Sequence, residues 1–202
     1  FSATMGVAVF VPFSYVMEPE AALLLLAGIY CGGVYGGSIP GILIGIPGTP
    51  ASVPTAMEGR SLTNRGESGR ALAMATFALA EILMAVLRPG KDNSEEEARQ
   101  MQQLGSLKLS KEEVREIAPP IARSSVLGFL IGVLPGAGAT IAAFMAYGAE
   151  RNIAGQQRQE QFGQGSLRGL AAPEAANNAA STGSFVPLLT LGIPGSGTTA
   201  LI

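Results

Sequence analysis

The chain has 202 residues, of which 48% are hydrophobic and only 14% are charged, against about 25% charged residues in an ordinary soluble domain. A net charge of −2 provides no basic surface, so we expect no nucleic-acid partner. The sequence contains no histidine, which excludes Ser-His-Asp catalysis, Cys-His catalysis and HExxH zinc sites. We therefore expect no enzymatic activity, no cofactor and no fixed metal site.

The charged residues that do occur are segregated along the chain. Three long blocks carry none of them: residues 21–57, 124–149 and 175–202. Each block is at least as long as the roughly 20 residues that a membrane-spanning helix needs. The pattern predicts an all-α fold of polytopic membrane helices embedded in a lipid bilayer.

The N-terminal part of the chain is typical of two membrane segments. Residues 1–17 are uncharged and interrupted by Pro12, as at the end of a membrane helix. Residues 21–46 are the most apolar run, and they pass into a tract of small residues that would let helices approach closely: Gly28, Gly32, Gly33, Gly36 and Gly37.

A polar loop and a further helix follow. Residues 58–70 hold three arginines and two glutamates, an arginine excess that favours the cytoplasmic side. Residues 71–87 have the composition of a helix, which carries Glu81. This carboxylate is either an intramembrane functional group or a residue at the helix end beside Arg88.

The stretch from residue 88 to 118 is unlike the rest, because it is rich in charged and amide side chains. Ser110 followed by Glu113 predicts a helix start with a capping box, and Pro119 with Pro120 is expected to end that helix. We therefore divide the chain into an N-terminal membrane repeat (1–87), a polar charged connector (88–120) and a C-terminal membrane repeat (121–202). Both repeats are expected to be incomplete.

The second half contains another interrupted block and a polar helix face. Residues 134–138, Leu-Pro-Gly-Ala-Gly, are expected to break the uncharged block 124–149 into two helices. Residues 171–180 favour a helix, and on its surface one face would carry Glu174, Asn177 and Asn178.

The sequence Gly-Ile-Pro-Gly occurs twice, at residues 45–48 and 192–195. The same alignment places Pro40 on Pro187 and Thr49 on Ser196. Proline removes a backbone donor and glycine permits backbone angles closed to other residues, so each copy predicts a break in an apolar segment. We expect paired Pro-Gly-broken or re-entrant segments in two related repeats.

A phosphate-binding loop is the alternative interpretation of the second copy. Residues 192–199, GIPGSGTT, place glycines and a hydroxyl as in G-x4-G-K-[ST], but Thr198 stands where the lysine is required. No strand is apparent before the loop. A soluble phosphate-binding enzyme is therefore only a remote alternative.

Broken membrane helices expose backbone groups that can bind solutes and ions. Corresponding broken segments in two halves of a chain are the sequence feature that best indicates a transporter's binding site. Because the uncharged blocks hold no Lys or Arg, an anionic solute would be met by backbone N–H groups, hydroxyls, amides or a co-bound cation such as transient Na⁺. The alternative for each hydroxyl is a bond to its own helix. The predicted substrate and ion site comprises Ser38, Pro47, Gly48, Thr49, Pro135, Gly136, Gly138, Thr140, Asn177, Asn178, Pro194, Gly195, Ser196 and Thr198.

Three long segments resemble the large membrane (permease) subunit of the tripartite tricarboxylate transporter family. They are YGGSIPGILIGIPGTPASVPTAMEG (35–59), GVLPGAGATIAAFMAYGAER (132–151) and AAPEAANNAASTGSFVPLLTLGIPGSGTTA (171–200). The resemblance implies a multi-pass permease of the bacterial inner membrane, a secondary transporter that takes up a carboxylate by symport with Na⁺ or H⁺. It also implies two partners, a periplasmic solute-binding protein and a small membrane subunit.

The chain departs from that family in length. Family members are more than twice as long, and the N-terminal block here joins mid-family sequence near residues 77–81. The chain is therefore either shortened or fragmentary. A membrane-inserted fragment without transport activity of its own is the alternative to a working permease subunit.

Overall fold

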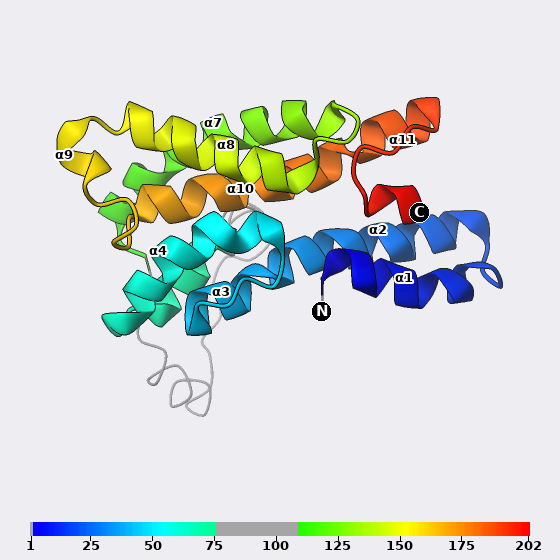
Figure 1. Cartoon of the computed structure of the whole chain (residues 1–202), viewed down its shortest axis with the longest axis horizontal. Coiled ribbons are helices and arrows are strands. Elements are labelled where there is room, and N and C mark those ends of the chain that lie inside the picture. Colours follow the sequence, from blue (N-terminus) through cyan, green and yellow to red (C-terminus); the bar gives the residue numbers. More distant parts are fainter. Residues whose placement is uncertain (1, 76–108) are drawn as a thin grey trace.

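The computed structural model describes residues 2–75 and 109–202, and within these ranges every regular element is a helix. This confirms the predicted all-α fold. The first half forms one layer and the second half another (Figure 1). The first layer contains α1 (Ala3–Ser14), α2 (Pro19–Gly36), α3 (Ser38–Ile44), the short 3₁₀ helix η1 (Pro50–Ser52) and α4 (Val53–Asn64). The second contains α7 (Lys111–Val133), α8 (Gly138–Ile153), α9 (Gln156–Gln159), α10 (Leu167–Gly183), α11 (Phe185–Leu191) and the 3₁₀ helix η2 (Thr199–Leu201).

Part of the predicted connector lies outside the described residues. So do residues 76–87 of the helix predicted over residues 71–87, with Glu81, while residues 68–75 are helical. The division of the chain into two repeats and a connector stays a prediction.

The expectation that Pro119 and Pro120 end a helix is wrong. Helix α7 begins at the predicted capping box of Ser110 and Glu113 and continues through both prolines to Val133. A proline at position i removes the bond to the carbonyl of residue i−4, here residues 115 and 116. Arg115 is exposed and Glu116 half-buried, so water can bind these carbonyls near the helix start and the helix persists.

Helix α10 lies at the centre of the molecule, where it packs against α7, α8, α4 and α2. Its contact with α7 is made by small residues on both helices. A Cβ atom on Gly128 would overlap the Ala176 backbone, and one on Gly132 would overlap that of Ala180. Such close approach replaces side-chain interdigitation in membrane helices, because lipid provides no hydrophobic drive between them.

The predicted small-residue tract of α2 packs only in part. A Cβ on Gly33 would lie 2.7 Å from Cα of Ala3, so this glycine permits the contact between α1 and α2. Gly37 approaches the first Gly-Ile-Pro-Gly break. The remaining three glycines, Gly28, Gly32 and Gly36, have no described atom within 4 Å of an added Cβ.

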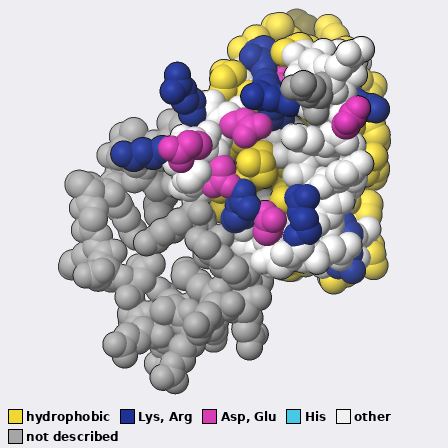
Figure 2. Space-filling model, turned by 90° about the vertical axis from the view of Figure 1, so that its left-hand side faces the viewer, with side chains coloured by type: hydrophobic (Ala, Val, Ile, Leu, Met, Phe, Trp, Pro, Cys, Tyr) yellow, Lys and Arg dark blue, Asp and Glu magenta, His cyan; other side chains and the backbone are white. Residues whose placement is uncertain are grey.

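Within residues 2–75 and 109–202, two segments are long and apolar enough to cross a membrane, Pro19–Ile44 and Lys111–Val133. Large hydrophobic side chains are exposed on several helices, including Leu24, Val126 and Leu189. Figure 2 shows Lys, Arg, Asp and Glu side chains gathered on the end of the molecule at the left of Figure 1. This distribution is the one expected of helices whose sides face lipid and whose end faces water.

Candidate functional site

The two Gly-Ile-Pro-Gly segments have the same local geometry. Helix α3 ends at Gly45, with φ of 75°, whose N–H donates to the Gly41 carbonyl at 3.1 Å. Helix α11 ends at Gly192, with φ of 67°, whose N–H donates to the Leu188 carbonyl at 3.0 Å. Both glycines adopt the left-handed conformation that ends a helix and that other residues rarely adopt. The predicted breaks are therefore present, while their extension to two whole repeats stays a prediction.

The likeness continues beyond each break into a pair of hydroxyl residues. Ser52 Oγ donates to the carbonyl oxygen of Thr49 at 2.8 Å. In the second break Thr199 Oγ1 donates to the carbonyl oxygen of Ser196 at 2.9 Å. In each pair the first residue's backbone N–H also donates to the hydroxyl of the second. Both copies of Gly-Ile-Pro-Gly are followed directly by hydroxyl residues three positions apart, a sequence feature that could have indicated this turn.

The last glycine of each motif allows the chain to fold back on the preceding helix junction. An added Cβ on Gly48 would lie 2.9 Å from Cα of Gly37, and one on Gly195 would lie 2.7 Å from Cα of Ser184. Gly48 also donates its N–H to the Gly37 carbonyl at 2.9 Å. These glycines permit the close backbone contacts within the breaks, and any larger residue would push the two backbone segments apart.

The third break separates α7 from α8 and contacts the second directly. Helix α7 ends at Val133 and α8 begins at Gly138, as the Leu-Pro-Gly-Ala-Gly segment predicted. The backbone N–H of Gly136 donates to the Gly195 carbonyl at 3.1 Å. This bond fixes the start of α8 beside the second Gly-Ile-Pro-Gly segment.

All three breaks line one cavity of about 300 Å³. The first break contributes Thr49, the second contributes Ser196 and Thr198, and the third contributes Gly136, Gly138 and Thr140. Residues next to these on the same breaks complete that side of the cavity: Pro50, Ala51, Ala137, Ala139 and Gly197. Sequence reasoning missed the opposite part of the lining, which comes from the start of α1 and from α2: Ser2, Ala3, Thr4, Tyr30 and Val34. The hydroxyls of Thr4 and Thr198 are 2.7 Å apart and join α1 to the second break across this wall.

The cavity presents hydroxyls and backbone N–H groups. No Lys, Arg, Asp or Glu occurs among the described residues that line it. The first turn of α8, which includes Gly138 and Thr140, lines it, and the N–H groups of a helix's first turn have no partner within the helix. They carry a partial positive charge toward the cavity. The arrangement can therefore accept an anionic or hydrogen-bonding group without a fixed cation.

Comparison with known proteins decides the family. The sequence matches the model of the tripartite tricarboxylate transporter TctA family over residues 1–78 and 73–202. The chain belongs to this family. The two matched stretches meet at residues 73–78, close to the junction that the sequence indicates near residues 77–81.

Two curated relatives come from Agrobacterium vitis. A 52.8 kDa uncharacterized protein in the TAR-I ttuC' 3' region is 29% identical over 293 residues, covering 98% of this chain and 58% of the relative. An uncharacterized protein in the TAR-II ttuC' 3' region is 51% identical over 75 residues, covering 37% of this chain and 30% of the relative. The chain thus spans less than two thirds of the length of either relative. No solved structure is significantly similar to it.

The other predicted site residues of this TctA-family chain lie outside the cavity lining. Three prolines, Pro47, Pro135 and Pro194, are exposed on the breaks, where Gly48 and Gly195 also lie. Asn178 is half-buried on α10. Ser38 and Asn177 are fully buried and come together elsewhere, around the carboxyl group of Glu174.

This buried cluster joins the two layers. Glu174 Oε1 accepts hydrogen bonds from Ser38 Oγ at 2.7 Å, from Thr55 Oγ1, and from Asn177 Nδ2 at 3.2 Å. The four residues come from α10, from the start of α3 and from α4. Sequence reasoning placed Glu174 on the same helix face as Asn177 but left it out of the predicted site, because nothing in the sequence shows which residues of α3 and α4 would meet it.

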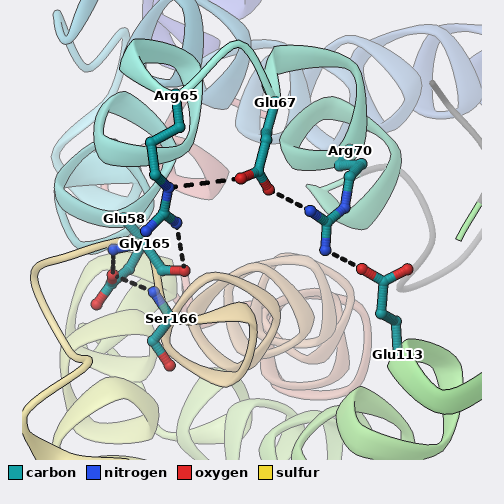
Figure 3. A network of polar contacts seen from close by, with 7 residues as sticks. All are labelled: Glu58, Arg65, Glu67, Arg70, Glu113, Gly165 and Ser166. Atoms are coloured by element: carbon teal, nitrogen blue, oxygen red, sulfur yellow. Dashed lines mark hydrogen bonds and ion pairs between the residues drawn. The ribbon is translucent and has the colours of Figure 1, made fainter. Parts of the chain in front are cut away.

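A second buried carboxyl group organises the charged end of the molecule. Glu58 Oε1 accepts from the Tyr147 hydroxyl at 2.8 Å and the Gly163 N–H at 2.6 Å. Its Oε2 accepts from the N–H groups of Gly165 at 2.8 Å and Ser166 at 2.7 Å. Figure 3 shows the Gly165 and Ser166 bonds beside an ion-pair chain that runs through Arg65, Glu67, Arg70 and Glu113. This network holds the loop before α10 onto α4.

Proposed function

We propose that this chain is the permease subunit, or part of it, of a carboxylate uptake system in the bacterial inner membrane. The family is that of tripartite tricarboxylate transporters, which supports a membrane transporter rather than an enzyme. The observation that carries the proposal is the meeting of three helix breaks at one cavity, because broken helices at corresponding positions in two halves of a chain form transporter binding sites.

The carboxylate would be bound by neutral groups. The N–H groups at the start of α8 and the hydroxyls of Thr49, Ser196 and Thr198 surround the cavity and can donate hydrogen bonds to carboxylate oxygens. Thr49 and Ser196 occupy equivalent places after the two Gly-Ile-Pro-Gly segments. Each is therefore proposed to hold the same solute from one half of the chain.

In the proposed system a periplasmic solute-binding protein delivers the carboxylate, and a small membrane subunit completes the permease. Uptake would use alternating access around the breaks, driven by symport with an ion gradient. The exposed apolar sides of the helices support a multi-pass position in the bilayer, and the arginine-rich charged end would face the cytoplasm.

The experiment is uptake of labelled tricarboxylates and dicarboxylates by cells that express the chain with a family binding protein and small subunit. Thr49→Val and Ser196→Ala remove one hydroxyl from each break while keeping similar volume, and each is expected to reduce kcat/KM at least tenfold. Thr190→Val is the matched control, because the Thr190 hydroxyl bonds to the Val186 carbonyl of its own helix at 2.6 Å, outside the cavity. Variants that are present in the membrane and transport like the wild type would contradict the site.

A membrane-inserted fragment without activity of its own is the second candidate. Its supporting observation is the alignment with the first relative, which spans 293 residues of that protein and covers only 58% of it. If the chain alone is inactive but uptake returns when a separately encoded remainder is co-expressed, the chain is a part of the permease. Uptake by this chain without any added segment would exclude the fragment hypothesis.

A further inference from the structure

Glu174 is a buried carboxyl group without a counter-charge. Its side chain is fully buried, and in the described parts of the chain no Lys or Arg forms an ion pair with it. Glu150, which is also buried, is instead met by Arg123 and Arg168. An ionised carboxylate in a water-excluded site without a partner is costly, so such a group needs another explanation.

The hydrogen bonds around Glu174 are distributed unequally between its two oxygens. Oε1 accepts all three bonds, from Ser38, Thr55 and Asn177. Oε2 is buried and has no partner, and the amide oxygen Oδ1 of Asn177 is also buried without one. The cluster therefore contains two unpaired acceptors, one helical turn apart, and lacks a donor for either.

A proton on Glu174 accounts for the unpaired Oε2. A carboxylic acid that is protonated on Oε2 keeps Oε1 as an acceptor for its three donors and turns Oε2 into a donor. Asn177 Oδ1 is then an available acceptor on the neighbouring turn. A metal ion fits less well, since hard cations take six or more oxygen ligands and Oε1 is already occupied by three hydrogen bonds. We propose that Glu174 is a proton-binding site, held as a neutral carboxylic acid in this arrangement of the helices.

The hydrogen bonds of Glu174 link its protonation to the arrangement of the helices around α10. Glu174 on α10 is bonded to Ser38, at the start of the helix that ends in the first Gly-Ile-Pro-Gly break, and to Thr55 on α4. Loss of the proton breaks the O–H bond, leaves the electron pair on Oε2 and passes the proton to water. The resulting buried charge favours arrangements in which water reaches α10, so that protonation and the position of α3 are linked. This link rests on the proposed function, in which access alternates around the helix breaks.

Other titratable groups on the helices packed against α10 have different partners. On α4, Glu58 is bonded to the loop before α10 and Arg60 to the Leu43 carbonyl. On α7, Glu113 pairs with Arg70 and Arg123 with Glu150 of α8. On α8 and α2, Tyr147 is bonded to Glu58 and Cys31 accepts from Ser181. Also on α2, the Tyr30 hydroxyl accepts a hydrogen bond from Ser184, and Tyr35 is half-buried. The remaining titratable side chains on these helices are exposed or half-exposed: Glu20, Lys111, Glu112, Arg115, Glu116 and Arg151.

The proton can be observed without any transport assay. Infrared spectra of the purified chain in lipid at pH 7 are expected to contain the C=O stretching band of a neutral carboxylic acid that shifts in D₂O. Glu174→Gln should remove this band, whereas Glu150→Gln should leave it. Thr55→Val removes one donor to the acid's C=O oxygen and should move the band to higher wavenumber. This variant decides the assignment even if Glu174→Gln fails to fold.

Two results would overturn the proposal. One is a folded wild-type protein without a neutral-acid band between pH 5 and 7. The other is a higher unfolding temperature of the wild type in NaCl than in choline chloride, with no such difference in Glu174→Gln. That result would assign a Na⁺ site instead.

Uptake measurements test separately whether protonation of Glu174 is linked to the position of α3. Wild-type uptake of a labelled tricarboxylate that follows an inward proton gradient, and uptake by Glu174→Gln that does not, would support it. Equal dependence in both would overturn it. Absence of uptake from the wild type with its partners would overturn both the proposed function and the link between protonation and α3. The infrared band would still decide whether Glu174 carries the proton.

Discussion

The backbone N–H of Gly136 donates a hydrogen bond to the carbonyl oxygen of Gly195 at 3.1 Å, and thereby joins two helix breaks that lie far apart in the sequence. This bond is a backbone contact, so it requires that both segments leave the helical conformation and approach without side chains between them. The cavity that all three breaks line depends on that approach. Residues that control how closely backbone segments pack should therefore affect stability more than their small size suggests.

Gly195→Ala tests the approach directly. The new Cβ would lie 2.7 Å from both Cα and Cβ of Ser184, so the second break must move away from the start of α11. We expect a loss of about 1–3 kcal/mol of stability from overpacking, measured as a lower unfolding temperature in detergent. Gly197→Ala is the control, because no described atom lies within 4 Å of its added Cβ. Equal unfolding temperatures for the two variants would contradict the close approach.

The contact between α7 and α10 yields a second prediction. In Gly132→Ala the added methyl group would overlap the Ala180 backbone, so the helices must separate and lose packing along the central helix. We expect a destabilisation of roughly 1–3 kcal/mol and a smaller yield of monodisperse protein in size-exclusion chromatography. Gly148→Ala on α8 meets open space, and alanine is the better helix former by about 1 kcal/mol. This control should match or exceed the wild type.

The helical class and all three breaks could be predicted from the sequence because they depend on local chemistry. Glycine favours the left-handed conformation that ends a helix, and Gly45 and Gly192 both adopt it at the ends of α3 and α11. The prediction for Pro119 and Pro120 failed because the carbonyls they free lie near the start of α7, beside exposed or half-buried residues. Local signals contain no information about which surface surrounds a proline.

The candidate site could be predicted only in part for a related reason. Thr49, Ser196 and Thr198 were recognised because each directly follows a break. Thr4 and Tyr30 line the same cavity from helices whose sequences contain no signal for it. The donors that surround Glu174 likewise come from α3 and α4, and their meeting with α10 is a property of tertiary packing.

Glu58→Gln is expected to release the loop before α10. The carboxylate accepts hydrogen bonds from three backbone N–H groups and the Tyr147 hydroxyl, whereas a glutamine amide would turn an NH₂ donor toward some of these donors. Leaving buried donors unpaired costs about 1–3 kcal/mol. Limited proteolysis between residues 155 and 166 should become faster in this variant. Glu160→Gln, which changes an exposed glutamate of the same loop, should be cleaved at the wild-type rate.

The Glu150 ion pairs predict a graded result. Arg168 contacts Glu150 at 2.5 Å with a side chain that is 13% exposed, whereas Arg123 contacts it at 2.9 Å with a side chain that is 43% exposed. Solvent screening weakens the more exposed pair. We therefore expect Arg168→Gln to lower the unfolding temperature more than Arg123→Gln.

Glu150→Gln should lower the stability by about 2 kcal/mol, less than the 3–5 kcal/mol lost when a fully buried pair is broken, because water reaches one of the arginine partners. Added salt should reduce the effect of Arg123→Gln and leave that of Arg168→Gln nearly unchanged. Equal effects from the two arginine variants would show that burial does not determine the strength of these pairs.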